Sequence, residues 1–348
     1  MQKLIFVVDD SDTNLALAND ALREHYRVIT LPSADKMFGM LKKVAPDLIL
    51  LDIEMPGMNG FEALRILKAT DIFMDIPVMF LTSRSDPSNE AYGIELGAVD
   101  FVSKPFSKPV LLNRMKYHLH VGELIREHTA ELMKAQNGIV YSMADIIESR
   151  DENTGGHIER TTLFTKILVE EMMRQDVYFG EIHKWNLDLF ISSARLHDVG
   201  KIAISSAILN KPAALTEEEF KMMTTHTTEG ERIIEKIIQR TGNIELLNNA
   251  RLSAVSHHER WDGKGYPYGL KQTEIPLQGR IVAIVDVYDA LMSKRPYKEA
   301  FTEDEAFAII KSEAGTHFDP FIAGVFIDIR DRFHKEYIKT GFPEYKIA

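Results

Sequence analysis

Short apolar runs alternate with amphipathic segments over the first 120 residues of the chain. The runs span Leu4–Val8, Arg27–Leu31, Leu48–Leu51, Val78–Leu81 and Phe101–Ser103. Most of them are continuously apolar, as expected of strands that are buried on both faces. The segments between them, such as NLALANDALREH and GFEALRILKAT, have the spacing of helices. Five successive βα units predict an α/β fold with a doubly wound, five-stranded parallel sheet.

The pattern changes after this region. From Pro109 to Ile147 the chain is compatible with one long helix, in which Ile125, Leu132 and Ile139 belong to a seam with steps of three to four residues. Such a seam is typical of an amphipathic helix that docks on a domain of its own chain, and equally of a dimeric coiled coil. Beyond about residue 140 helical periodicity dominates, which predicts an all-α domain. The expected organisation is a domain at 1–120, a helical linker at 121–142 and a second domain at 143–348.

Composition narrows the class of protein. Apolar residues make up 45% of the 348 residues, which is enough for two cores. The net charge of −11 and the lack of a Lys/Arg block argue against nucleic-acid binding. There is no cysteine, so disulfides and thiolate metal ligands are excluded. Because no segment looks like a signal peptide or a membrane span, we expect a cytoplasmic protein without membrane insertion.

Polar residues stand where the predicted strands end. Asp9 and Asp10 follow the first strand, Asp52 the third, and Thr82 and Lys104 the fourth and fifth. The carboxyl ends of parallel strands meet at one edge of a sheet, where a site is expected. Three carboxylates there repel one another unless a cation such as Mg²⁺ lies among them, and the lysine and hydroxyl suit a phosphoryl group. Simple capping of the next helix would explain only the acids after the first strand.

This half resembles a response-regulator receiver domain. The stretches VVDDS, LILLDIEMPGMNGFE, MFLTS and DFVSKPF carry the resemblance, which covers residues 1–120. It implies that Asp52 accepts a phosphoryl group from a sensor histidine kinase, and that the Lys104–Pro105 peptide bond is cis. The implied Mg²⁺ ligands are Asp9, Asp10 and Asp52, and the implied switch residues are Thr82, Phe101 and Lys104.

The second half concentrates histidine and buried acids. Seven of the twelve histidines lie within residues 157–317. Asp198 follows His197 in an apolar segment that we expect to be helical, and Asp286 interrupts the run IVAIVDVYDAL in the same way. An uncompensated buried carboxylate is costly, so buried acids near histidines are usually paired or bound to metal. A lone histidine such as His226 is more simply interpreted as a satisfied core or surface residue.

The adjacent histidines His257 and His258 need another explanation. Neighbours on a helix point about 100° apart, so one apolar face cannot bury both. The polar landmarks of this half are His157, His197, Asp198, His226, His257, His258 and Asp286. Five His and two Asp exceed the ligand number of one tetrahedral zinc and suit two metals, with Fe, Mn or Ni favoured. His257 and His258 would then bind the metal cluster from opposite sides. Two such metals activate a bridging hydroxide and clamp an in-line phosphoryl displacement.

Cationic and aromatic residues near these landmarks suit a phosphate substrate. Lys201 lies four residues after His197, on the same face of the expected helix. Arg295 and Lys298 follow Asp286 in the chain. The stretch DGKGYP carries an aromatic ring that can stack on a base or donate to a phosphate, although a plain turn would have the same residues.

This half resembles the HD-GYP family from about Asp145 to Pro320. HDVGK supplies the HD, GYP at Gly265–Pro267 supplies the rest, and DALMSKRPY and GTHFDP also match. The resemblance implies an all-helical, metal-dependent phosphodiesterase that opens cyclic di-GMP to pGpG, with GMP as a further product. It implies that the seven landmarks are the metal ligands, with Asp198 bridging. The implied catalytic residues are Asp198 and Lys201, and the implied substrate contacts are Lys201, Gly265, Tyr266, Arg295 and Lys298.

Two departures and several alternatives remain. Asn153 stands where many family members have a Glu that supports a third metal, so we expect two metals. Ser205-Ser206 replaces the usual Pro-Asp, which leaves the local loop contacts open. Other hypotheses are a sensing or docking module with little turnover, and a hydrolase that prefers pGpG or another cyclic dinucleotide. The complete ligand set favours the enzyme, and the long helix offers a route to a homodimer.

Overall fold

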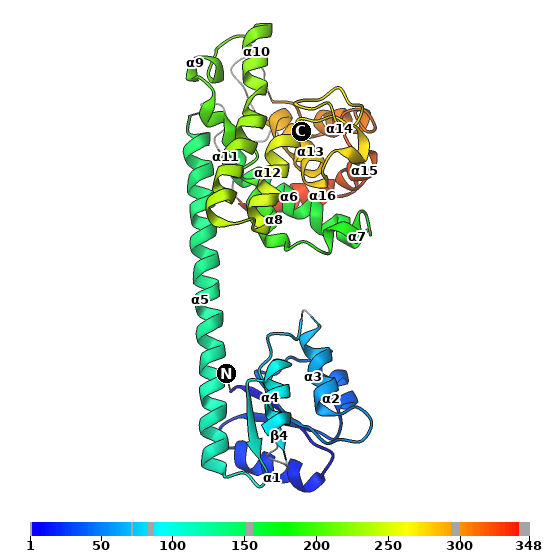
Figure 1. The fold of residues 1–348 in the computed structure, drawn as a ribbon. Coiled ribbons are helices and arrows are strands. Elements are labelled where there is room, and N and C mark those ends of the chain that lie inside the picture. The colour runs from blue at the N-terminus through cyan, green and yellow to red at the C-terminus, as the bar shows by residue number, and fades with distance from the viewer. Residues whose placement is uncertain (1, 71, 83–86, 151–155, 294–299, 341–348) are drawn as a thin grey trace. The chain divides into compact units, whose positions relative to one another are not determined.

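The computed structural model describes residues 2–70, 72–82, 87–150, 156–293 and 300–340. The chain divides into two compact units, residues 1–132 and 133–348 (Figure 1). No described helix combines the length and the apolar character that a membrane crossing requires.

The first unit is built on a five-stranded parallel sheet in the order β2-β1-β3-β4-β5. The strands are β1 (Leu4–Val8), β2 (Arg27–Leu31), β3 (Leu48–Asp52), β4 (Val78–Thr82) and β5 (Asp100–Ser103). Every residue of β1, β3 and β4 is buried, whereas the edge strand β2 is partly exposed. The predicted doubly wound sheet is confirmed, and each predicted strand agrees with the observed one to within one residue.

Helices cover both faces of this sheet. They are α1 (Asp12–Leu22), α2 (Ala34–Leu41), α3 (Gly60–Lys68) and α4 (Pro87–Glu95), followed by α5 (Lys108–Glu148). Side chains alternate between the faces of a strand. Accordingly Phe6 and Val8 pack in one cluster with α2 and α3, while Ile5 and Val7 pack in another with α1 and the first turns of α5.

The helix α5 agrees with the long helix predicted from Pro109 to Ile147. It has 41 residues, and the expected linker at 121–142 lies inside it. Its first turns contribute Leu111 and Met115 to a core of the first unit. Its last turns contribute Val140, Ala144 and Ile147 to a core of the second unit. The limits proposed for the domains stay predictions.

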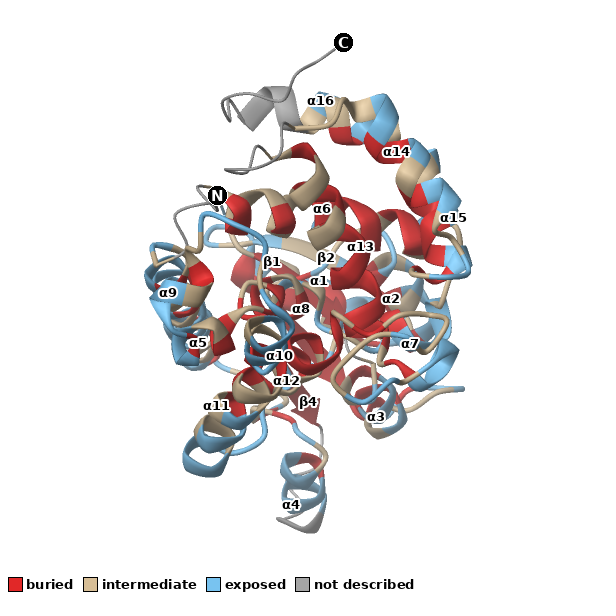
Figure 2. Ribbon diagram, turned by 90° about the horizontal axis from the view of Figure 1, so that it is seen from above, coloured by how far each residue is buried: buried red, intermediate tan, exposed pale blue. Residues whose placement is uncertain are grey.

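The second unit is helical. Its elements are α6 (His157–Arg174), α7 (Phe179–Ile182), α8 (Leu187–Ala194), η1 (Val199–Ala203), α9 (Ser206–Leu209), α10 (Glu217–Thr224), α11 (His226–Thr241), α12 (Glu245–Ser256), η2 (Gln272–Glu274), α13 (Leu277–Met292), α14 (Glu303–Ser312), α15 (Pro320–Asp328) and α16 (Arg330–Thr340). The helix α13 is apolar and buried along most of its length, and it packs with α6 and α15 in the main core (Figure 2). The predicted all-α domain is confirmed.

Candidate metal centre

The seven candidate ligands of the second unit come from separate elements and converge at one place. His157 opens α6, His197 and Asp198 lie between α8 and η1, His226 opens α11, His257 and His258 follow α12, and Asp286 lies within α13. The ligand atoms of six of them form two groups, and Asp286 lies beside the first. The first contains His157, His197 and Asp198, and the second contains His226, His257 and His258. The idea that the adjacent histidines serve opposite sides is therefore wrong, because both belong to the second group.

The expected helix through His197 and Asp198 is also wrong. The helix α8 ends at Ala194, and a turn precedes the short 3₁₀ helix η1. A Cβ on Gly200 would lie 1.8 Å from the carbonyl oxygen of His226, so η1 lies directly against the backbone of α11. This close approach brings Asp198 beside His226, with Asp198 Oδ1 3.4 Å from His226 Nε2.

The Asp198 carboxylate lies between the two groups. Its Oδ2 is 3.5 Å from His197 Nε2, while its Oδ1 is 3.4 Å from His226 Nε2 and 3.6 Å from His257 Nε2. Oδ1 is buried and accepts no hydrogen bond from the part of the chain that the structure describes. A buried carboxylate oxygen without a donor is costly, and a cation on that side would satisfy it.

The histidine tautomers agree with metal binding. Nδ1 of His197 lies 2.8 Å from the carbonyl oxygen of Ala194, and Nδ1 of His226 lies 2.8 Å from that of Met223. Nδ1 of His257 lies 3.0 Å from the carbonyl oxygen of Ser253. A carbonyl can only accept, so Nδ1 carries the proton and Nε2 keeps its lone pair. Metal-bound histidines are oriented by this kind of hydrogen bond.

The Nε2 atoms of neighbouring histidines face one another in both groups. Nε2 of His157 and Nε2 of His197 are 3.4 Å apart, and the same atoms of His226 and His257 are also 3.4 Å apart. Paired Nε2 atoms at this distance offer two ligands to one divalent cation, which would displace the proton that His157 holds at neutral pH. The donor set therefore fits two metals, one in each group, and Asp286 Oδ1 lies 3.5 Å from His157 Nε2 on the first side.

Burial keeps most of these imidazoles neutral. It lowers the pKa of His197 and of His226 to about 4. Burial, with the neighbouring His257 and His226, also lowers the pKa of His258 well below its ordinary value. A histidine must be neutral to bind a metal, so these three side chains are ready to do so at neutral pH.

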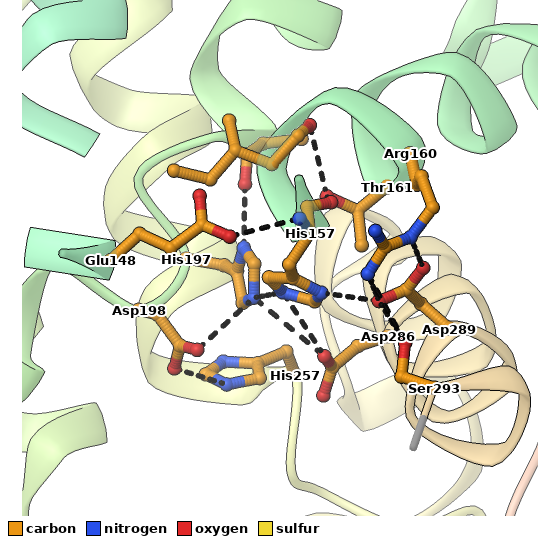
Figure 3. A network of polar contacts seen from close by, with 12 residues as sticks. Glu148, His157, Arg160, Thr161, His197, Asp198, His257, Asp286, Asp289 and Ser293 are labelled. Atoms are coloured by element: carbon orange, nitrogen blue, oxygen red, sulfur yellow. Dashed lines mark hydrogen bonds and ion pairs between the residues drawn. The ribbon is translucent and has the colours of Figure 1, made fainter. Parts of the chain in front are cut away.

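His157 is held differently, by a carboxylate (Figure 3). Its Nδ1 lies 2.8 Å from Asp289 Oδ2, and Arg160 donates to the same carboxylate from Nε at 2.5 Å. Burial lowers the pKa of His157, but the hydrogen bond and charge of Asp289, with Asp286 and Asp198, outweigh it and raise that pKa to about 8. Burial raises the pKa of Asp289, but His157 and Arg160 outweigh this and hold it at about 2.

A cavity of about 350 Å³ opens over the two groups. Its lining includes His157, Arg160, Asp198, Lys201, Phe220, His226, His258, Tyr266, Asp286 and Asp289. Lys201 Nζ lies 2.7 Å from Asp198 Oδ2. The Tyr266 ring stacks on the His258 ring, with 4.8 Å between the ring centroids. Burial and the charges of Asp198 and Asp286 raise the pKa of Tyr266, so its phenol stays protonated.

Gly265 supports this wall of the cavity through its backbone. A Cβ there would lie 2.4 Å from the nitrogen of Arg260 and 2.5 Å from Cα of Glu259, so only glycine allows the loop to fold back on the chain. The following Tyr266–Pro267 bond is cis. The other two predicted substrate contacts, Arg295 and Lys298, lie outside the described residues, as does Asn153.

The carboxylates of the first unit meet at the carboxyl edge of the sheet. Asp9, Asp10 and Asp52 form a group whose ligand atoms lie within 4.8 Å of one another. Lys104 Nζ lies 2.6 Å from Asp9 Oδ2 and 2.8 Å from Asp52 Oδ1. Burial and the charge of Asp9 raise the pKa of Asp52 against the opposing effect of Lys104. The Lys104–Pro105 bond is cis, as expected.

Two of the three predicted switch residues, Thr82 and Phe101, are buried beside this edge. Thr82 ends β4 and is 6% exposed, and Phe101 in β5 is 8% exposed. The Phe101 ring packs on Phe80 at 5.2 Å. A Cβ on Gly93 would lie 2.4 Å from the Phe101 ring, so this glycine leaves room for the ring in its inward position.

Comparison with known proteins gives the family. A response regulator receiver domain matches residues 5–116, and an HD domain matches residues 142–322. The chain belongs to the response regulators with an HD domain. Both resemblances inferred from the motifs are thereby confirmed, and the second unit is a metal-dependent hydrolase domain.

Several curated relatives share this organisation in whole or in part. A probable cyclic di-GMP phosphodiesterase of Vibrio cholerae is 38% identical over 96% of this chain and 81% of its own length. The cyclic di-GMP phosphodiesterase response regulator RpfG of Xanthomonas campestris is 34% identical over 79% of this chain and 73% of its own. A 3′3′-cGAMP-specific phosphodiesterase of Vibrio cholerae is 34% identical over 58% of this chain and 36% of its own.

Sequence reasoning missed two residues of the HD domain. Asp289 lies three residues after Asp286, one turn further along α13, and Arg160 lies three residues after His157 in α6. That spacing puts each on the same helix face as a candidate ligand, which was the available signal. Their pairing across two helices required the tertiary structure.

Proposed function

We propose that this response regulator hydrolyses cyclic di-GMP to pGpG at a binuclear metal centre in its HD domain, under the control of phosphorylation at Asp52. The observation that carries the proposal is the Asp198 carboxylate, which lies between two histidine groups and has a buried oxygen without a donor among the described residues. The substrate comes from the names of two relatives that the chain matches over most of its length.

The two metals would share Asp198. His157, His197 and Asp286 would complete the first site, and His226, His257 and His258 the second. Mixed nitrogen and oxygen ligands favour Fe, Mn or Ni. Metals bound there supply an activated water nucleophile and neutralise charge on the phosphoryl oxygens.

The chain's own residues would bind and orient the phosphodiester. Lys201 lines the cavity beside Asp198, so its ammonium supplies positive charge where phosphate oxygens approach. Tyr266 keeps its proton and can donate a hydrogen bond, and its ring forms one wall of the cavity. The centroid of the Phe220 ring lies 6.2 Å from that of the Tyr266 ring, so Phe220 enlarges the apolar surface against which a base can pack.

The receiver would supply the regulation. Mg²⁺ would bind Asp9, Asp10 and Asp52, where three carboxylates meet. A sensor histidine kinase would donate the phosphoryl group, and Lys104 would pair with it. The cytoplasmic location and the homodimer through α5 remain predictions.

The experiment is product identification. Anaerobically purified protein, loaded with Mn²⁺ or Fe²⁺, is incubated with cyclic di-GMP, 3′3′-cGAMP or pGpG, and the products are identified by mass spectrometry. We expect cyclic di-GMP to be opened to pGpG fastest. Faster opening of 3′3′-cGAMP would instead favour the activity named for the third relative. Binding of cyclic di-GMP without any product would show a sensing module and contradict the proposal.

A further inference from the structure

The helix α6 begins without a capping side chain of its own. Its N-cap is Gly156 at φ 74°, which has no side chain to accept from the first turn. The first N–H groups of a helix have no intrahelical partner. The N–H of His157 donates instead to Glu148 Oε1 at 2.8 Å, across nine residues of sequence (Figure 3). A carboxylate at a helix N-terminus is also favoured by the helix dipole.

This contact fixes a candidate ligand. The backbone of His157 is held by Glu148, and its ring is held by Asp289 through Nδ1 at 2.8 Å. With both ends held, Nε2 points to His197 Nε2 at 3.4 Å. Loss of the backbone anchor would let the first turn of α6 loosen, and the imidazole would move with it.

Arg150, two residues after the end of α5, contacts the segment that follows Asp198 in the chain. Arg150 Nη1 donates to the carbonyl oxygen of Ile202 at 2.6 Å, and Arg150 Nη2 donates to that of Ile204 at 3.2 Å. These carbonyls belong to η1 and the residue after it, and η1 carries Lys201. Ile147 of α5 is buried in one cluster with the direct sequence neighbours of three candidate ligands: Ile158, Leu196 and Val199.

The second histidine group is anchored by its own segments. His226 Nδ1 pairs with the carbonyl of Met223, just before α11, and His257 Nδ1 pairs with that of Ser253 in α12. Among these contacts, the hydrogen bond from the end of α5 to a candidate ligand is the one to His157, in the first group. This asymmetry makes a selective effect on one metal site testable.

We propose that Glu148 is a positioning residue for His157, through which the last turn of α5 sets the metal affinity of the first site and not that of the second. The inference rests on the proposed binuclear centre. The inference also predicts how α5 acts on the metal centre, because a displacement of its last turn would move His157 before the other candidate ligands.

The test compares Glu148→Ala and Glu148→Gln with Glu127→Ala, a glutamate exposed on the same helix. Metal content per chain is measured after dialysis against a weak chelator, with circular dichroism as a check of folding. We expect two ions in wild type and in Glu127→Ala, and about one in Glu148→Ala. Glu148→Gln should retain more metal than Glu148→Ala, because its amide oxygen can still accept from the His157 N–H.

A second pair of variants identifies the site that is lost. His258→Ala alone should retain about one ion, in the first site. Glu148→Ala combined with His258→Ala should retain almost none. Equal retention in Glu148→Ala and wild type would overturn the inference, as would loss of the ion from the second site instead of the first. A folded wild type that binds no metal would overturn the proposed function itself, which distinguishes the two failures.

Discussion

Asp198 is partly buried between imidazoles, with 18% of its side chain exposed, and yet it remains charged. Burial raises its pKa, but Lys201, His197 and the histidines of the second group outweigh burial and hold that pKa well below its ordinary value. The carboxylate is thus available to bind cations throughout the physiological range. Lys201 donates on the Oδ2 side only, which leaves Oδ1 directed to the second histidine group.

The histidine pKa values predict how the stability of the metal-free HD domain depends on pH. His197 and His226 have a pKa of about 4 when folded and about 6.5 when unfolded. The unfolded chain therefore binds more protons between these values, and stability falls as pH drops from 6.5 towards 4. His157, with a folded pKa of about 8, has the opposite sign. Its contribution is complete below pH 6.5 and is lost as pH rises through 8.

We therefore expect the metal-free domain to be most stable near pH 6.5. On the acid side its free energy of unfolding should fall by roughly 1–3 kcal/mol per pH unit. Urea unfolding of chelator-treated protein measures this, and fluorescence reports the HD domain alone, because both tryptophans, Trp185 and Trp261, lie in it. Higher stability at pH 5 than at pH 6.5 would show that these histidines are not buried in neutral form.

Single residues could be predicted where the residue type itself is improbable. Asp198 and Asp286 were recognised because a carboxylate in an apolar run needs a partner. Asp289 lies in the same run and was overlooked, because its role depends on the Arg160 side chain from another helix. Glu148 carries no signal in the sequence, since an acid at the end of a helix is ordinary and its target lies across a loop.

At the scale of elements, the contact between η1 and α11 determines where the two groups meet. The absent Cβ of Gly200 allows the approach to the His226 carbonyl. We predict that Gly200→Ala pushes η1 away, costs about 1–3 kcal/mol of stability, and lowers metal retention and turnover by more than tenfold. Gly324→Ala is the matched control, because nothing lies within 4 Å of its added Cβ.

The outcome is measured by thermal unfolding and metal analysis of both variants. The control in α15 should be unchanged, or slightly more stable because alanine favours a helix. Wild-type metal content in Gly200→Ala would mean that the two elements tolerate a wider separation, and that Asp198 is not positioned by this contact.

The limits of helices and strands could be predicted where the pattern of apolar residues is simple. The strands β1, β3 and β4 are apolar at nearly every residue because helices cover both faces, and their limits could be read from the sequence. The segment at His197 also carries many apolar residues, but it leaves the helix after Ala194 and continues as η1. The length and period of an apolar segment cannot distinguish a buried helix from a turn that is forced by a neighbouring backbone. The helix predicted through His197 and Asp198 was wrong for this reason.

At the scale of the whole molecule, α5 carries an unpaired apolar seam. Ile125, Leu132, Ile139 and Ile146 recur every seven residues and are 62%, 71%, 63% and 62% exposed. A seven-residue repeat of this kind is typical of a coiled coil. We predict a dimer of the full chain that is weakened by Leu132→Glu together with Ile139→Glu.

Light scattering across a concentration series measures the dimer. Ala130→Glu, at an exposed position on another face of α5, is the control and should dimerise like wild type. If the double variant dimerises with unchanged affinity, the seam is not the interface. A wild type that stays monomeric at high concentration would contradict the homodimer.

Phosphorylation of the receiver should alter turnover in the HD domain through α5. A phosphoryl group at Asp52 adds negative charge beside Asp9. We expect Lys104 and Thr82 to move in response to this charge. We predict that a small-molecule phosphodonor or a beryllofluoride mimic changes kcat or KM at least several-fold in wild type and has no effect in Asp52→Asn. Identical kinetics and identical oligomeric state in treated and untreated wild type would show that the receiver is not coupled to the HD domain.

The measurement that tests the central claim most directly is metal content and turnover of cyclic di-GMP on the same samples of wild type and Asp198→Ala. Asp198 lies between both histidine groups, so its removal should affect both ions. We predict about two ions per chain and hydrolysis in wild type, and near-complete loss of both ions and of turnover in a folded Asp198→Ala. Full metal occupancy in Asp198→Ala, or hydrolysis at the wild-type rate, would contradict a binuclear centre built on this carboxylate.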